Sequence, residues 1–317
     1  MLPVPASARP RVAVLGVGTM GRHHARVFAQ LGNEFDLVGV YDPRSEAALE
    51  VARAFRVKAF SEESDAIEAA DLVVIASPIE AHAGAARRAL ARGRHLFVEK
   101  PLCATAAQAF ALALACGVER GQRLFVGHSE RFNPVVRALR SALRPGDVHA
   151  LRLRRTTPLL RSPHEHSALL SLGVHDLDLI AYLTASPVAL REVPYVDDDR
   201  ADLVLTAAAA TVAWMHVDRK AEVRERSLEV ETPDALFLGD LLAKTLTVRW
   251  RGDAAITRCE LAPEEPLVAQ ALAIARALQG TDGEAASGVD GAQALALVEQ
   301  AMQSVPAKRP HAAEASP

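Results

Sequence analysis

A histidine stands beside two acids in an otherwise largely apolar stretch at 169–180, which reads LLSLGVHDLDLI. On an α-helix, Ser171, His175, Asp178 and Tyr182 are spaced four, three and four residues apart and therefore share one face. Leucine, valine and isoleucine fill most of the other positions, so the helix should be buried with one polar stripe, which points to a pocket. An imidazole there could act as a general base, and a hydrogen-bonded core histidine is the alternative.

A lysine ends another apolar run, HLFVEKP at 95–101. If this run is a parallel strand, Lys100 lies at its carboxyl end, where such sheets bind ligands. Pro101 fixes its own φ, restricts Lys100 and can follow a cis peptide bond, so the ammonium is presented in a defined direction. A surface lysine before a helix-starting proline is the simpler interpretation of these residues alone.

Three glycines form a G-x-G-x-x-G pattern between an expected strand and an expected helix. In VAVLGVGTMGRHHARVF, Gly16 makes the tight turn, Gly18 lets a pyrophosphate approach the backbone, and Gly21 lets helix and strand pack closely. The helix N-terminus at Thr19 and Met20 faces the anion. A glycine-rich structural turn would have the same pattern, so the residues of the next strand are needed to distinguish it from a cofactor site.

That strand ends in Asp42, about 20 residues beyond the last glycine, where an acid can bind the adenosine ribose hydroxyls. With strand, glycines, helix, second strand and acid in order, the pattern predicts a dinucleotide cofactor. Asp42 should repel a 2′-phosphate, which favours NAD. Arg44, two residues further, leaves NADP as the alternative.

No metal site is expected. The HEH sequence at 164–166 lies near His175, but side chains two positions apart on a helix diverge. The spacing of a helical zinc site is absent from the sequence, and a solvated helix start accounts better for His164 and His166.

The elements that must position these residues follow from the hydrophobic pattern. Short apolar runs alternate with alanine-rich helical segments, which predicts βαβ units and a doubly wound parallel sheet. Its strands are expected at 11–17, 35–41, 71–77, 95–100 and 123–128.

After Asn133-Pro134, alternating runs between 147 and 250 predict a mostly antiparallel sheet. A helix over about 162–184 interrupts it, with Ser162 and Glu165 spaced as a capping box. Two further helices are expected at 264–279 and 289–304.

We therefore expect an α/β protein. An NAD(P)-binding Rossmann domain should cover 1–128, and an α+β domain for substrate binding and oligomerisation should cover 129–317. The tail over about 306–317 should be mobile.

Three segments together resemble the Gfo/Idh/MocA oxidoreductase family. They are ASPIEAHAGAARRALARGRHLFVEKPL at 76–102, GHSERFNPVVRAL at 127–139 and GVHDLDLIAYL at 173–183. They match the family's Glu-Lys-Pro, its R-F-x-P segment and its G-x-H-x-x-D helix, in the family's order through nearly the whole chain.

The resemblance implies an NAD(P)-dependent dehydrogenase acting on CH–OH groups. Lys100 would hydrogen-bond the reacting hydroxyl and stabilise the developing alkoxide, and His175 would take the hydroxyl proton. Further cofactor contacts are expected from Ser77, Pro78, His82, Glu99 and Lys100, and substrate contacts from Arg131, Asn133, Ser171 and Asp178.

One position departs from the family pattern. Many members carry an aspartate four residues before the histidine, where this chain has Ser171. A hydroxyl can form hydrogen bonds but holds no charge, so a Lys–Asp–His triad is incomplete. A non-catalytic NAD-binding regulator or scaffold therefore remains an alternative.

The segment VGHSERFNPVVRAL most resembles family members that oxidise UDP-sugars. The resemblance implies oxidation of UDP-N-acetylglucosamine to its 3-keto form for lipid A or surface glycans, with another sugar or polyol as the alternative. Arg131 and the basic run LRLRR at 151–155 could neutralise a diphosphate, or the run could be an ordinary exposed strand face.

The composition sets the remaining limits. The chain has 317 residues, 50% of them hydrophobic, and a net charge of −3, as is usual for a soluble globular protein without a nucleic-acid partner. No apolar run approaches the length of a membrane span, and the N-terminus resembles no signal peptide, so we expect a cytoplasmic enzyme. Three distant cysteines give no disulfide framework. A homodimer or homotetramer is expected.

Overall fold

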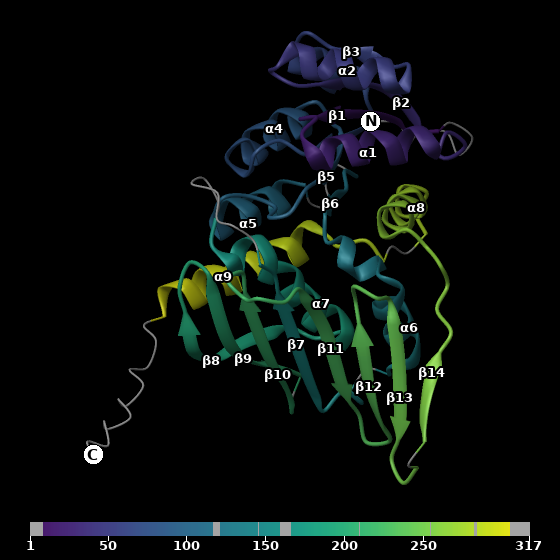
Figure 1. Cartoon of the computed structure of the whole chain (residues 1–317). Coiled ribbons are helices and arrows are strands. Elements are labelled where there is room, and N and C mark those ends of the chain that lie inside the picture. The colour runs from purple at the N-terminus through teal and green to yellow at the C-terminus, as the bar shows by residue number, and fades with distance from the viewer. Residues whose placement is uncertain are drawn as a thin grey trace. The chain divides into compact units, whose positions relative to one another are not determined.

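The computed structural model describes residues 9–116, 121–144, 146–158, 166–208, 210–253, 255–281 and 284–304. They form two compact units, and Figure 1 shows the elements of both. The first unit comprises the described residues up to Ala138 together with Leu261–Ala296, and the second comprises Leu139–Glu260 and the described residues from Leu297 onward. The units therefore differ from the continuous ranges 1–128 and 129–317 expected from the sequence. The predicted mobile tail lies outside the described residues.

The first unit is built on a six-stranded sheet whose neighbours all pair in parallel, in the order β3-β2-β1-β4-β5-β6. The strands are β1 (Arg11–Leu15), β2 (Asp36–Tyr41), β3 (Lys58–Ala59), β4 (Leu72–Ile75), β5 (His95–Val98) and β6 (Leu124–Val126). The strand order reverses between β1 and β4. Ligands of doubly wound sheets bind beside the carboxyl ends of the strands at such a reversal.

Helices connect these strands, as the alternating pattern predicts. They are α1 (Thr19–Gln30), α2 (Ser45–Phe55), α3 (Glu63–Ala69), α4 (Ile79–Ala91) and α5 (Ala106–Ala115), followed by the 3₁₀ turn η1 (Ser129–Phe132) and α6 (Pro134–Ala142).

A helix from much later in the chain completes the first unit. This helix, α8 (Pro266–Leu278), contacts α1 and η1. Its Ile274 and Ala277 lie in the same buried cluster as Phe28 and Phe35. Burial of these apolar side chains is what draws residues 261–296 back to the first unit.

The second unit contains an eight-stranded sheet in the order β14-β13-β12-β11-β7-β10-β9-β8. Its strands are β7 (Ala150–Thr156), β8 (Val188–Val196), β9 (Arg200–Ala207), β10 (Thr211–Asp218), β11 (Glu225–Glu231), β12 (Ala235–Asp240), β13 (Thr245–Trp250) and β14 (Ile256–Cys259). Only β7 and β10 pair in parallel, so the expected mostly antiparallel sheet is confirmed.

One face of this sheet is covered and the other is open. On β10, Ala213, Met215 and Val217 are buried, whereas Trp214 and His216 project from the opposite face, as the pleat requires. The helix α7 (Val174–Thr184) contacts β8, β9 and β10, and Met215 packs against Gly173 just before it. The last helix, α9 (Gly288–Gln303), runs from the first unit into the second.

Candidate active site

The turn between β1 and α1 is closed by two glycines. Gly16 has φ of +86°, and its N–H donates a 2.8 Å hydrogen bond to the Tyr41 carbonyl. A Cβ on Gly16 would lie 2.6 Å from the Ser77 nitrogen, and a Cβ on Gly21 would lie 1.8 Å from the Gly16 oxygen. The two glycines thus allow strand, turn and helix to pack closely, as the pattern predicts.

The middle glycine faces open space. Gly18 is the N-cap of α1, and a Cβ there would meet no heavy atom of the described residues within 4 Å. The first turn of α1, at Thr19 and Met20, contains no acidic residue. The positive end of the helix dipole is therefore open to an anion, which fits the pyrophosphate of a dinucleotide.

Asp42 is held firmly at the end of β2. Its carboxylate accepts hydrogen bonds from the N–H groups of Val17 and Arg44, both at 2.9 Å, and from Arg44 Nε at 3.1 Å. Burial alone would raise the pKa of Asp42, but these donors hold the pKa below its usual value. An ionised carboxylate beside the glycine turn is a suitable acceptor for ribose hydroxyls.

The loop after β4 offers another polar group to a ligand. The hydroxyl oxygen of Ser77 is buried and has no hydrogen-bond partner among the described residues. Pro78 is the N-cap of α4 and is exposed. His82, one turn into α4, is 2% exposed, and its Nε2 lies 2.8 Å from the Ser77 carbonyl oxygen. An orphaned hydroxyl at this edge of the sheet fits a bound cofactor.

The Glu-Lys-Pro segment follows β5. Glu99 is buried; its Oε1 lies 2.7 Å from His24 Nε2, and its Oε2 accepts a 3.0 Å hydrogen bond from the Lys100 N–H. Burial alone would raise the pKa of Glu99, but His24 and Lys100 hold it below its usual value. The Lys100-Pro101 peptide bond is cis. The carboxylate thus contacts protein groups, and its predicted cofactor contact stays a prediction.

Arg131 and Asn133, expected to contact substrate, are both buried and have partners within the first unit. Arg131 Nη2 lies 3.5 Å from the Asp290 carboxylate. Asn133 Oδ1 accepts a 3.1 Å hydrogen bond from the Val135 N–H at the start of α6. These contacts give both residues a structural role, and their substrate contacts rest on the resemblance.

The segment that carries Ser171 and His175 differs from one regular helix. It begins with a π-helical turn, η2 (Leu169–Gly173), and the α-helix α7 starts only at Val174. A π-turn is wider than an α-turn, so the four-residue spacing from Ser171 to His175 is not that of a regular α-helix. The expected capping box at Ser162 and Glu165, and His164, lie outside the described residues.

A polar stripe is nevertheless present. Ser171, His175 and Tyr182 are partly exposed, whereas the leucines and Ile180 on the other side of α7 are buried. The Ser171 hydroxyl donates a 2.9 Å hydrogen bond to the Ser167 carbonyl. Asp178 is 2% exposed.

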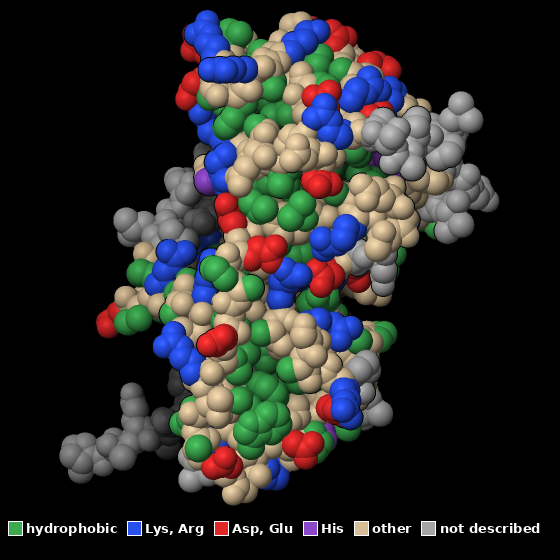
Figure 2. Space-filling view, turned by 90° about the vertical axis from the view of Figure 1, so that its right-hand side faces the viewer, with side chains coloured by type: hydrophobic (Ala, Val, Ile, Leu, Met, Phe, Trp, Pro, Cys, Tyr) green, Lys and Arg blue, Asp and Glu red, His purple; other side chains and the backbone are tan. Residues whose placement is uncertain are grey.

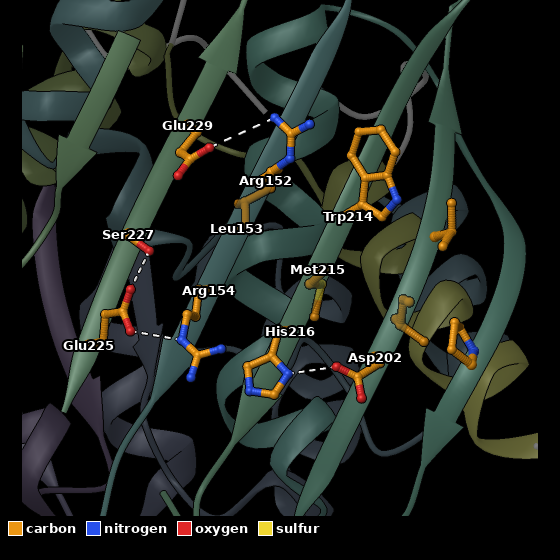
Figure 3. Close-up of a pocket in the computed structure, with 13 residues that line it drawn as sticks. Arg152, Leu153, Arg154, Asp202, Trp214, Met215, His216, Glu225, Ser227 and Glu229 are labelled. Carbon is orange, nitrogen blue, oxygen red and sulfur yellow. Dashed lines mark hydrogen bonds and ion pairs between the residues drawn. The ribbon is translucent and has the colours of Figure 1, made fainter. Parts of the chain in front are cut away.

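The basic run on β7 is divided between the two faces of the sheet. Arg155 is buried and bonded to Asp176 of α7, with Nη2 to Oδ1 at 2.7 Å. Arg152 and Arg154 lie on the open face, where Figure 3 shows them beside Glu229 and Glu225 of β11. Neighbouring acids balance these charges, so the run favours a strand face over a diphosphate site. No sequence pattern indicated the Arg155–Asp176 pair, whose members lie 21 residues apart.

The first unit therefore brings together, at the carboxyl ends of neighbouring strands, the glycine turn, Asp42, Ser77 and Lys100. Ser171, His175 and Asp178 lie in the second unit. Among the described residues, no three histidine, cysteine or acidic side chains are grouped as metal ligands, and no helix is long and apolar enough to cross a membrane. Figure 2 shows basic and acidic side chains interspersed over the face drawn.

The chain matches known proteins in sequence and structure. Residues 10–128 match an oxidoreductase family with an NAD-binding Rossmann fold. UDP-N-acetylglucosamine 3-dehydrogenase of Acidithiobacillus ferrooxidans is 32% identical over 247 residues, which are 76% of this chain and 77% of that protein. Inositol 2-dehydrogenase of Leifsonia xyli is 32% identical over 192 residues, 58% of this chain and 56% of that protein.

A solved structure of the Acidithiobacillus dehydrogenase is similar to this chain with a TM-score of 0.87. The match has 29% identity and covers 94% of this chain and 98% of the other. The similarity thus extends well beyond the Rossmann unit.

Proposed function

The chain belongs to the Gfo/Idh/MocA family of NAD-binding oxidoreductases, and from this we propose that it oxidises a secondary hydroxyl of a nucleotide sugar. The proposed substrate is UDP-N-acetylglucosamine, and the product is its 3-keto form. The observation that carries this choice is the combination of 32% identity with 77% coverage of the Acidithiobacillus dehydrogenase. The inositol 2-dehydrogenase of Leifsonia xyli has the same identity over 56% of its length, and that of Rhizobium meliloti is covered to 98% at 27% identity. Oxidation of a free sugar or polyol, as the second relative's name indicates, is the alternative.

The proposed cofactor is NAD, which accepts the hydride when bound. The glycine turn and the start of α1 would hold the pyrophosphate, and Asp42 would accept hydrogen bonds from the adenosine ribose. Support for NAD over NADP comes from the Asp42 carboxylate, whose charge would repel a 2′-phosphate. Arg44 Nε already donates a 3.1 Å hydrogen bond to that carboxylate, so its guanidinium is less able to bind the 2′-phosphate of NADP.

Lys100 and His175 are the proposed catalytic residues. As the carbinol hydrogen leaves as hydride, the Lys100 ammonium stabilises the negative charge on the oxygen, and His175 accepts the hydroxyl proton. The carbinol thereby becomes a ketone. Asp178 and Ser171 would position the sugar or the imidazole, and Arg131 and Asn133 would contact substrate as the family resemblance implies.

A homodimer or homotetramer is the proposed assembly, with the open face of the second sheet meeting the same face of a second copy. Trp214 is 41% exposed there, and the hollow around it, of about 330 Å³, is drawn in Figure 3. Arginines on β7 lie beside acids on β11, with Arg154 2.8 Å from Glu225. Two such faces related by a twofold axis are complementary in charge.

Analytical ultracentrifugation checks the assembly. Arg154→Glu and Glu225→Arg should each shift the protein toward monomer, and the double variant should recover part of the oligomer. A monomeric wild-type protein would overturn this proposal.

The activity is tested by incubating the purified protein with NAD and a panel of UDP-sugars, free sugars and inositol while following NADH absorbance. Turnover of UDP-N-acetylglucosamine is expected, with a product two hydrogens lighter by mass spectrometry. Activity only on free sugars or inositol would refute the nucleotide-sugar assignment. If NAD binds, no substrate is oxidised and Lys100→Ala changes nothing, the chain is a regulator or scaffold.

A further inference from the structure

The Lys100 backbone leaves the sheet at a defined point. The Glu99 N–H still donates to the Ile75 carbonyl of β4 at 2.8 Å, so Glu99 belongs to the sheet framework. The next N–H, that of Lys100, donates instead to the Glu99 side chain at 3.0 Å. The direction in which the lysine departs therefore depends on where the Glu99 carboxylate is held.

Two elements fix that carboxylate. His24 of α1 is 2% exposed, lies 2.7 Å from Glu99 Oε1 and packs edge-on against Phe97. On another side, a Cβ on Gly127 would lie 2.9 Å from the carboxyl carbon of Glu99. The carboxylate thus fills the space that only a glycine leaves open, and its buried charge needs the imidazole as a partner.

A second buried histidine holds the other end of the segment. His82 Nδ1 lies 3.0 Å from the Pro101 carbonyl oxygen, and its Nε2 lies 2.8 Å from the Ser77 carbonyl oxygen. Both neighbours are carbonyl oxygens, so a ring N–H of His82 can donate a hydrogen bond to either of them. His82 thereby links the loop after β4 to the loop after β5.

We propose that His24 and His82 are positioning residues, which hold Glu99 and Pro101 on either side of Lys100 and so aim its ammonium. This assignment rests on the proposed function, in which Lys100 contacts the reacting hydroxyl. It gives His82 and Glu99 a role in place of direct contact with the cofactor. It also connects α1, whose N-terminus would face the cofactor, to the proposed catalytic lysine through two hydrogen bonds of Glu99, one with His24 and one with the Lys100 N–H.

The test compares His24→Leu and His82→Leu with His23→Gln. His23 is the exposed neighbour of His24 on the same helix and is a matched control. In the two leucine variants kcat should fall by about 10- to 100-fold, since a small misplacement of a catalytic group has effects of this size. The KM for the sugar and the Kd for NAD should change little. His24→Gln, which retains a donor toward Glu99, should recover part of kcat.

Hydrogen–deuterium exchange gives a readout that does not depend on activity. The peptide containing the Lys100 N–H should exchange faster in His24→Leu, while peptides from α2 and α3 keep their wild-type rates. A merely structural role would instead raise exchange throughout the first unit. Wild-type kcat together with unchanged exchange near Lys100 would overturn the proposal.

The two proposals fail in different ways. If the wild-type protein oxidises no sugar, the proposed function fails, and the exchange measurement still decides whether His24 holds the Lys100 segment. If a leucine variant does not fold, Glu99→Gln carries the same comparison, because it removes one of the two carboxylate oxygens that contact His24 and the Lys100 N–H. Wild-type kcat and exchange in that variant would reject the positioning role.

Discussion

The guanidinium of Arg155 donates hydrogen bonds from two of its nitrogens to the carboxylate of Asp176, from Nη2 to Oδ1 at 2.7 Å and from Nε to Oδ2 at 3.0 Å. Both side chains are 3% exposed. The pair links α7, the helix that carries His175, to strand β7 of the second sheet. The acid next to the proposed base is therefore a structural residue.

Removing one partner of this pair should destabilise the protein strongly. Asp176→Leu removes the carboxylate that the buried Arg155 guanidinium contacts at 2.7 Å, and we expect a loss of about 3–5 kcal/mol in the free energy of unfolding. The double variant Arg155→Met/Asp176→Leu should recover much of it, because both members of the charged pair are then replaced by apolar side chains. Urea unfolding of the wild type and the two variants measures this, and an Asp176→Leu variant as stable as wild type would contradict the expectation.

The preference for NAD should depend on Asp42. Asp42→Ala removes both the acceptor for the ribose hydroxyls and the charge that repels a 2′-phosphate, and it releases Arg44. The ratio of NADP to NAD affinity should rise by about 10- to 100-fold, the equivalent of one charged hydrogen bond. Fluorescence titration with both cofactors checks this, with Glu46→Ala on the first turn of α2 as the control. An unchanged ratio would remove Asp42 from the cofactor site.

Ser171 should tolerate alanine better than aspartate. Its hydroxyl donates a 2.9 Å hydrogen bond to the carbonyl of Ser167, which lies just before the π-turn. Ser171→Ala loses that bond, at about 1 kcal/mol, whereas an ionised aspartate would face the same carbonyl oxygen and be repelled. Thermal unfolding should rank wild type above Ser171→Ala and that variant above Ser171→Asp. Equal melting temperatures for the last two would show that the turn rearranges.

Asp202, on the open face of the second sheet, should contribute to the loss of protein stability at low pH. Burial alone would raise the pKa of this carboxyl, but hydrogen bonds from His216 Nδ1 and Arg200 Nη2, both 2.6 Å, hold it below its ordinary value of 3.8. The unfolded chain therefore binds the proton more tightly than the folded protein. This stabilisation is complete above the unfolded pKa and is lost as the pH falls through the lowered folded pKa.

Asp202→Asn makes this measurable. The stability difference between wild type and variant should be largest near neutral pH and shrink as the pH falls below 3.8. Urea unfolding at a series of pH values follows it. A difference that stays constant between about pH 3 and about pH 7 would show that Asp202 titrates alike in both states.

Local patterns were sufficient for much of the first unit. Alternating strands and helices predicted five of the parallel strands within a few residues, and the glycine turn and Asp42 follow from short spacings. The two-residue strand β3 and the short helix α3 are too brief to give a periodic signal. The edge strand β8 contains Pro194, which weakens a strand pattern.

Contacts between distant segments could not be predicted in this way. A hydrophobic period indicates which face of a strand is buried but not which strand lies beside it, so the parallel pairing of β7 with β10 was not expected. The contact from His24 to Glu99 joins residues 75 positions apart. The π-turn around Ser171 also escaped prediction, because its sequence satisfies an α-helical spacing equally well.

The return of α8 to the first unit has a consequence for how the protein is made. Synthesis proceeds from the N-terminus, so the first sheet and its helices emerge long before residues 266–278. Until then Phe28 and Phe35 lack the cover of Ile274 and Ala277. The first unit is thus completed late in translation, and a gene fragment ending near residue 128 should yield an aggregation-prone product. Joining residues 261–296 to that fragment through a short linker should restore a soluble one.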